Sequence, residues 1–113
     1  MLKDLLIFAK IYELLKWLHQ ELARFPKSEK PVLGKRIYES TINILDSIIV
    51  ANEEKDKISF LKQASVELEK LRIFLRLAKD FRLISIGKYG FVSKEVNEIG
   101  KMLGGWIKKA ARG

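Results

Sequence analysis

The hydrophobic residues of this chain recur with the spacing of α-helices. Near the N-terminus, one apolar stripe at intervals of three and four residues consists of Ile7, Ile11, Leu14 and Leu18. A second stripe, on a neighbouring face, consists of Leu5, Phe8, Tyr12, Leu15 and Leu22. The segment Phe25-Pro26-Lys27 interrupts the pattern, because proline lacks the backbone N–H that a helix needs. The pattern predicts a first helix over about residues 2–24.

Three more helices follow from the same pattern. The second is expected over about 29–52, where one stripe consists of Ile37, Thr41, Ile44, Ile48 and Ala51. The third is expected over about 57–84, with a heptad repeat of Leu61, Ala64, Leu68, Leu71, Leu75 and Ala78. The stretch "SIGKYG" (85–90) predicts a turn, and Ser93 is the expected N-cap of a last helix over about 94–111.

Four helices with short connections predict an all-α fold, an antiparallel up-down four-helix bundle. The length of 113 residues fits one domain over 1–113. The third predicted helix carries a further apolar stripe, made by Val66, Ile73, Leu77, Phe81 and Ile84. This surplus is either a wide core stripe or a subunit interface, and large exposed apolar patches favour the interface.

The composition excludes several classes of protein. The chain has no cysteine, so disulfides, zinc–thiolate sites and thiol nucleophiles are ruled out. The longest apolar run near the N-terminus, Leu5 to Ala9, is far shorter than the roughly 20 residues of a membrane span. We therefore expect a cytoplasmic protein that does not engage a membrane.

Catalysis has little support in the sequence. His19 is the only histidine, and it stands alone in the first predicted helix. Glu53, Glu54 and Asp56 crowd a turn, where solvated carboxylates are the simplest interpretation. The glycines near the C-terminus lack the Lys-Ser/Thr pair and the preceding strand of a phosphate-binding loop. The sequence thus predicts a protein that is not an enzyme and has no catalytic residues, metal site or cofactor.

Positive charge is concentrated in the C-terminal part of the chain. From residue 70 onward there are eleven basic and three acidic residues, which accounts for the whole net charge of +8. Arg72, Arg76 and Lys79 share one face of the third predicted helix, with Arg82 nearby. Guanidinium groups suit phosphate or carboxylate, so an anionic partner is indicated, either nucleic acid or an acidic protein. The alternative is a solvated face with internal pairs such as Arg76–Asp80.

The C-terminal stretch "LGGWIKKAARG" (103–113) combines glycine, tryptophan and lysine in one expected helix. Gly100 and Gly104 are four residues apart, which lets another backbone approach closely, and Gly105 further weakens the helix. Trp106 faces the core, another subunit or a ligand, and the sequence leaves these three open. Lys108 and Lys109 join the basic residues of the third helix if the last helix lies beside it.

Three stretches resemble a known family of small four-helix bundles. "RFPKSEKPVLGKRI" (24–37) is similar to a motif shared by proteins of bacterial 23S rRNA intervening sequences and by accessory variability determinants (Avd) of diversity-generating retroelements. "LRLAKDFRLIS" (75–85) and "EIGKMLGGWIKK" (98–109) resemble the Avd branch. The region "LDSIIVANE" (45–53) departs from the "IPSNIAEG"-like stretch of the intervening-sequence branch.

This resemblance implies a non-catalytic accessory protein that assembles into a pentameric ring. It implies binding to a reverse transcriptase and, without sequence preference, to RNA or DNA, in support of mutagenic reverse transcription. It places these contacts on Arg72, Arg76, Lys79, Lys108 and Lys109. The alternative within the same family is an oligomeric interaction module of the intervening-sequence type, whose partner is an acidic protein.

Overall fold

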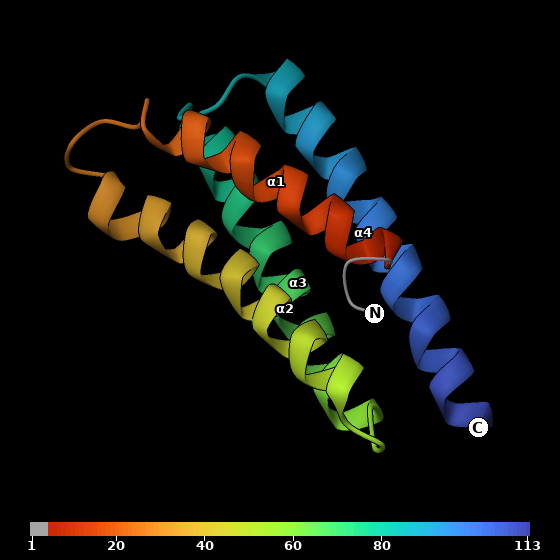
Figure 1. Cartoon of the computed structure of the whole chain (residues 1–113). Coiled ribbons are helices and arrows are strands. Elements are labelled where there is room, and N and C mark those ends of the chain that lie inside the picture. Colours follow the sequence, from red (N-terminus) through yellow and green to blue (C-terminus); the bar gives the residue numbers. More distant parts are fainter. Residues whose placement is uncertain (1–4) are drawn as a thin grey trace.

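The structure, a computed structural model, describes residues 5–113 and is all-α there. Its four α-helices are α1 (Leu6–Leu22), α2 (Lys35–Glu53), α3 (Ile58–Asp80) and α4 (Ile86–Arg112). Consecutive helices run in opposite directions (Figure 1). Helix α3 packs against α2 and α4, and α1 packs against α2 and α4 on the other side. The four helices are therefore packed compactly, as in a four-helix bundle.

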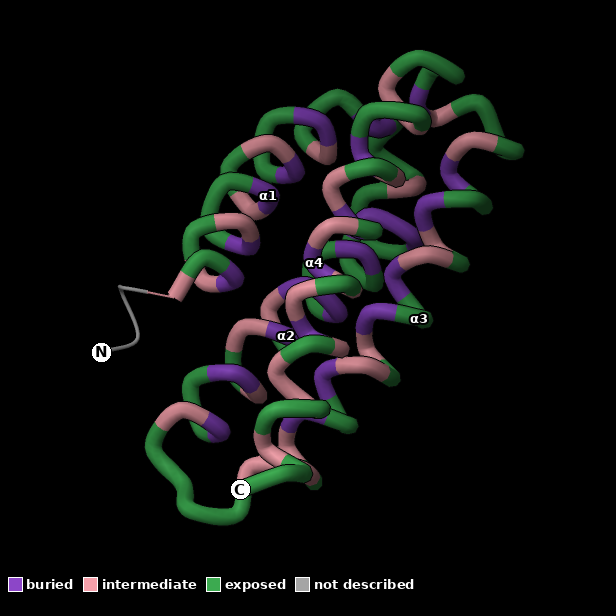
Figure 2. The backbone as a smooth tube through the Cα atoms, turned by 90° about the vertical axis from the view of Figure 1, so that its right-hand side faces the viewer, coloured by how far each residue is buried: buried purple, intermediate pink, exposed green. Residues whose placement is uncertain are grey.

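The core consists of the apolar stripes that the sequence predicts. In Figure 2 the buried residues lie on the inner side of each helix. Ile7, Ile11, Leu14 and Leu18 supply the buried side of α1, and all six heptad residues of α3 are buried. The second stripe of α1 is half-buried at Leu5, Phe8, Leu15 and Leu22 and exposed at Tyr12. Burial of these side chains is the main force that holds the helices together.

Helix α4 begins earlier than the sequence predicts. Ser85, not Ser93, is its N-cap, and the Ser85 hydroxyl accepts a hydrogen bond of 3.1 Å from the backbone N–H of Lys88. The stretch 85–90 is thus the cap and first turns of α4 instead of a turn between helices. Gly87 and Gly90 are exposed there, so their weak helix propensity is tolerated where the cap satisfies a terminal donor.

The second and third helices are also shorter than predicted. A π-helical turn, η2 (Lys30–Gly34), precedes α2, so the regular helix starts at Lys35 instead of near residue 29. Pro31 lies in this turn, and proline cannot donate the hydrogen bond of a regular helix. Helix α3 ends at Asp80 instead of Ile84. The part of the first predicted helix before residue 5 lies outside the described residues.

Polar contacts connect α1 to α4 along their partly buried seam. The Lys10 ammonium forms ion pairs with Glu95, at 3.2 Å, and with Glu98. Further along the seam, the Lys88 ammonium lies 2.8 Å from a Glu21 carboxylate oxygen. The Trp17 and Phe91 rings lie 5.5 Å apart, centroid to centroid. Helix α1 is thus attached both through its apolar stripe and through these pairs.

The surplus apolar stripe of α3 lies largely outside the core. Val66, Ile73, Leu77 and Phe81 are exposed, with 59% of Ile73 accessible, whereas Ile84 is buried beyond the end of the helix. Of the two interpretations left open by the sequence, a wide core stripe does not hold for these four side chains. Within residues 5–113, no helix is both long and apolar enough to cross a membrane.

Candidate functional site

Two of the three predicted basic residues of α3, Arg72 and Lys79, contact α4. The Arg72 guanidinium lies within 3.5 Å of the Asn97 side-chain oxygen on α4. About two helical turns further along α3, the Lys79 ammonium lies 4.9 Å from the centre of the Tyr89 ring, which is a cation–π contact. Arg76, between them in sequence, is exposed. The α3 set therefore borders α4 along about two turns of helix.

A shallow groove of about 440 Å³ separates α3 from α4 at the level of Arg72. Arg72 and Glu69 line it from α3, and Asn97, Gly100 and Lys101 line it from α4. Arg72 forms an ion pair with Glu69, one turn earlier on its own helix. The groove thus presents the Arg72 guanidinium and the Lys101 ammonium next to each other, with Glu69 as a carboxylate on the same surface.

Helix α4 contributes a row of lysines, of which Lys108 is predicted from the sequence and the other two are not. Lys94, Lys101 and Lys108 follow one another at intervals of seven residues, so they lie on the same side of α4. All three are exposed. Within residues 5–113, no carboxylate lies within 4 Å of any of them. The seven-residue interval is visible in the sequence. It indicates a binding surface only once the structure places Lys101 in the groove beside Arg72.

We call this surface the basic face, and it consists of Arg72, Arg76 and Lys79 of α3 and Lys94, Lys101 and Lys108 of α4. Two of its cations have acidic partners: Arg72 pairs with Glu69, and Lys79 lies 3.4 Å from Asp80. Asp80 thus pairs with Lys79 in place of the Arg76 that the sequence analysis considered. Among the described residues, Arg76 has no carboxylate within 4 Å. Most of the charge on this face is therefore available to an anion in solution.

Of the remaining two predicted basic residues, Arg82 lies next to one end of this face, where it lines a pocket together with Lys79 and Tyr89, and Lys109 lies away from the face. Arg82 lies in the turn that joins α3 to α4, where its backbone adopts a left-handed φ of 61°. Lys109 lines a pocket between α4 and the start of α1, on the other flank of α4. Lys108 and Lys109 are adjacent in sequence, but the helix directs them to different sides.

The glycines and the tryptophan of the C-terminal stretch have distinct surroundings. A side chain at Gly100 would meet the Arg72 guanidinium and Leu68 across the groove. Gly104 and Gly105 have nothing within 4 Å of the position of a Cβ atom, so neither packs closely inside this chain. Trp106 is half-buried against the core and lines the same pocket as Lys109. The stretch is helical throughout, up to Arg112.

The polar residues considered for catalysis do not converge in the structure. His19 is exposed on α1, while Glu53, Glu54 and Asp56 are exposed around the connection between α2 and α3. In the part of the chain that the structure describes, no three His, Asp or Glu side chains gather closely enough to hold a metal ion.

Fold and surface together define a small four-helix-bundle protein with one basic face. A protein-family model described as bAvd-like, for bacterial Avd, matches residues 5–110, which is nearly the whole chain. The chain therefore belongs to the bAvd-like family, as the resemblance predicts. The Avd family is a family of non-catalytic accessory proteins, and membership suggests the role of an accessory variability determinant in a diversity-generating retroelement. No curated protein gives a significant match to this chain.

Proposed function

We propose that this chain acts as a non-catalytic accessory of a retroelement reverse transcriptase and holds the polymerase and its RNA or cDNA together. The basic face is the observation that carries this proposal. Lys94, Lys101 and Lys108 form a row along α4, and Arg72 of α3 lines the same groove as Lys101. Seven residues of helix span about 10.5 Å, so the α4 row follows a path of about 21 Å on which a phosphate backbone can lie.

The chemistry of the face suits a polyanion without base recognition. Four of its six cations are exposed and have no acidic partner among residues 5–113, whereas Arg72 and Lys79 are half-buried and each pair with a carboxylate. Such contacts position a phosphate backbone and carry no direct sequence information. We therefore propose binding of RNA or single-stranded DNA with little sequence preference, and an affinity that falls steeply with salt.

The exposed apolar stripe on the outer side of α3 supports self-association. Val66, Ile73, Leu77 and Phe81 would be covered if this side of α3 met a second copy. We propose a ring-shaped homo-oligomer, most simply the pentamer that the family resemblance implies. Sedimentation velocity tests this: the wild-type chain is expected to form one defined oligomer, and Ile73→Lys to dissociate it without loss of helix content. A monomeric wild-type chain at micromolar concentration would contradict the proposal.

RNA binding is tested by charge reversal at Arg76, which makes no ion pair among the described residues. Arg76→Glu is expected to lower RNA affinity about tenfold at low salt and to reduce the log–log salt slope by about 0.7. Lys35→Glu, an exposed change on α2 with the same effect on net charge, is the matched control. Equal losses in the two variants would show that the total charge matters and that the basic face does not.

The alternative partner is an acidic protein surface. Arg72 and Lys79 already contact carboxylates within the chain, so carboxylate recognition on this face is chemically reasonable. A mobility-shift assay with RNA, run beside a pull-down with the reverse transcriptase, separates the two proposals. Retention of the polymerase together with no RNA shift at low salt would favour the protein partner.

A further inference from the structure

A pocket of about 600 Å³ lies at one end of the bundle, between the start of α1 and the last turns of α4. Helix α1 has 17 residues and α4 has 27, and the C-terminal turns of α4 extend past the beginning of α1 (Figure 1). The pocket lies beside α4 where it extends past α1. Lys57, at the start of α3, is a further lining residue. Its size is in the range of small-molecule sites.

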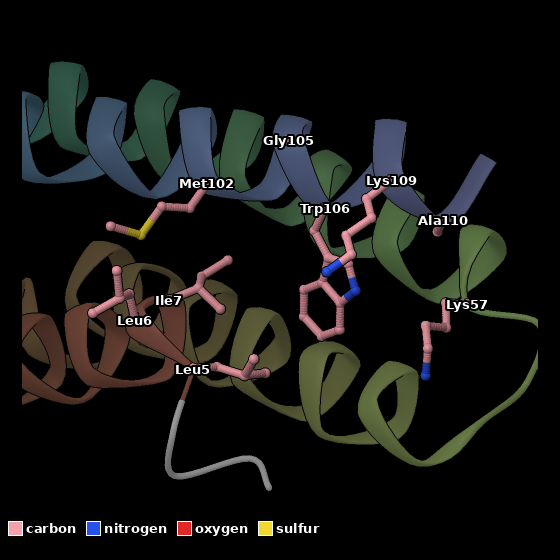
Figure 3. A pocket seen from close by; sticks show the side chains of 9 residues that line it. All are labelled: Leu5, Leu6, Ile7, Lys57, Met102, Gly105, Trp106, Lys109 and Ala110. Carbon is pink, nitrogen blue, oxygen red and sulfur yellow. The ribbon is translucent and has the colours of Figure 1, made fainter. Parts of the chain in front are cut away.

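The walls of the pocket are apolar. Figure 3 shows Leu5, just before α1, and Ile7 of α1 facing Met102 and Trp106 of α4 across the gap. Gly105 lies at the edge, where a Cβ atom would meet nothing within 4 Å. The missing side chain at Gly105 therefore helps to leave the opening free. The glycine–tryptophan pair that the basic face does not use thus belongs to this pocket.

Among the described residues, the two charged side chains that line the pocket are lysines, Lys57 and Lys109, and their roles differ. The Lys57 ammonium donates to the carbonyl oxygens of Ala51, Asn52 and Glu54, at 2.8, 3.3 and 2.7 Å. It therefore neutralises the negative end of α2 next to the pocket. Lys109 is exposed, and no carboxylate among residues 5–113 lies within 4 Å of it.

Lys109 and Trp106 place their polar ends at the same pocket. They are three residues apart on α4, so their side chains lie on one face of the helix, and Figure 3 shows both directed into the gap. The indole N–H and the ammonium are both hydrogen-bond donors, and neither group can accept. An anion accepts from both, whereas a neutral apolar ligand would leave these donors to water.

We propose that this pocket binds a small amphipathic anion, whose aliphatic or aromatic body fills the apolar gap and whose carboxylate meets Lys109. Charge complementarity favours this occupant, because none of the lining residues within 5–113 is acidic. The site is on the opposite flank of α4 from Arg72 and its groove, so the proposal stands independently of RNA or polymerase binding.

The test uses dodecanoate as an aliphatic carboxylate and 4-phenylbutanoate as an aromatic one. In the full chain carrying Trp17→Phe, Trp106 is the sole tryptophan and reports on the pocket by fluorescence. We expect a saturable change with one equivalent of dodecanoate per chain, below its micelle concentration. Tighter binding of dodecanoate than of 4-phenylbutanoate would indicate a ligand with an aliphatic chain, and the reverse order would indicate one with an aromatic ring. Dodecan-1-ol, with the same chain and no charge, is expected to bind about fivefold or more weakly.

Adjacent lysines provide the matched variants. Lys109→Gln is expected to weaken dodecanoate binding about fivefold, and Lys108→Gln, which points away from the pocket, to leave it unchanged. Ala110→Phe narrows the pocket and is expected to abolish the change, with helix content by circular dichroism as the folding check. No saturable change, equal effects of the two lysine variants, or equal binding of the alcohol would overturn the proposal. Affinity that falls as protein concentration rises would assign the pocket to a second copy instead and also overturn it.

Discussion

The Arg72 side chain of α3 fills the space that a side chain at Gly100 of α4 would occupy. A Cβ atom at residue 100 would lie 2.7 Å from Nη2 of Arg72 and 3.3 Å from a methyl carbon of Leu68. The guanidinium therefore reaches across the groove toward Asn97 only because residue 100 is glycine. This relationship gives Gly100 a role in placing Arg72 on the basic face, distinct from any close approach of two backbones.

Gly100→Ala should displace Arg72 without unfolding the bundle. The nearest atom is the end of a flexible side chain, so the clash is relieved by rotation of Arg72. Alanine is better than glycine in a helix by about 1 kcal/mol, and the clash should offset part of that gain. We expect a change in the Arg72 side-chain N–H resonances by NMR and, if the basic face binds RNA, a loss of affinity of about threefold.

Gly104→Ala is the control for this prediction. Gly104 lies one turn further along α4, is equally half-buried and has open space at the Cβ position. It should show the full gain in stability of about 1 kcal/mol in urea unfolding, with the Arg72 resonances and RNA affinity unchanged. If both alanine variants behaved alike, Gly100 would not control the position of Arg72.

Glu69 competes with any anion for Arg72. Because Glu69 pairs with the guanidinium on the surface of α3, its neutralisation should release Arg72 and remove a nearby negative charge. Glu69→Gln is expected to raise RNA affinity about two- to fivefold at low salt, with a smaller gain at high salt. Glu39→Gln, on the exposed surface of α2, makes the same change in net charge. Equal gains in the two variants would remove the specific role of Glu69.

The sequence predicts the helices well because their cores follow a regular repeat. All six heptad residues of α3 are buried, as are the first stripe of α1 and Val96, Ile99 and Leu103 of α4. The start of α4 was misplaced because Gly87 and Gly90 resemble turn residues, whereas the Ser85 cap and the exposed surface accommodate them. Local propensity is a weak guide where a cap decides the boundary.

The candidate site was less accessible to sequence reasoning. The α3 spacing of Arg72, Arg76 and Lys79 was visible, but the partner of Arg72 on α4 depends on how the two helices are aligned along their axes. Gly100 and Asn97 are more than twenty residues from Arg72, and no local pattern connects them. Lys108 and Lys109 belong to different surfaces, and this too could not be predicted, because it depends on which helix lies on each flank of α4.

Arg82 occupies a backbone position that favours glycine. Its N–H donates to the Lys79 carbonyl at 2.9 Å, and the Leu83 N–H donates to the Ala78 carbonyl at 2.8 Å, which together form the Schellman end of α3. The residue in this position is left-handed, with φ of 61°, and a side chain there is strained by about 1–2 kcal/mol.

Arg82→Gly should therefore stabilise the protein. The relief of strain is partly offset by the greater freedom of glycine in the unfolded chain, so we expect a net gain of about 0.5–1 kcal/mol in urea unfolding. Arg82→Lys keeps both the charge and the strain and should leave stability unchanged. A destabilised glycine variant would show that the Arg82 side chain makes contacts whose loss outweighs the backbone strain.

The Lys10 ion pairs between α1 and α4 should make stability depend on pH at both extremes. The hydrogen bond with Lys10, followed by its charge, lowers the pKa of Glu98 below the ordinary 4.5. The hydrogen bonds with Glu98 and then Glu95 raise the pKa of Lys10 above 10.5. A lowered carboxyl pKa stabilises the fold above the unfolded value and loses this effect as pH falls through the folded one. A raised lysine pKa stabilises the fold below the unfolded value and loses this effect as pH rises through the folded one.

Lys10→Gln should therefore reduce the free energy of unfolding at neutral pH by a small, salt-sensitive amount, because the pair is exposed to solvent. The difference from wild type should shrink below pH 4.5 and above pH 10.5, where one partner loses its charge. Urea unfolding across the pH range measures it. Lys16→Gln is the control, because it removes an ion pair with Glu13 within α1 and leaves the contacts between α1 and α4 in place. A difference that stays constant from acid to alkaline pH would mean that Lys10 acts through packing of its aliphatic stem and not through its charge.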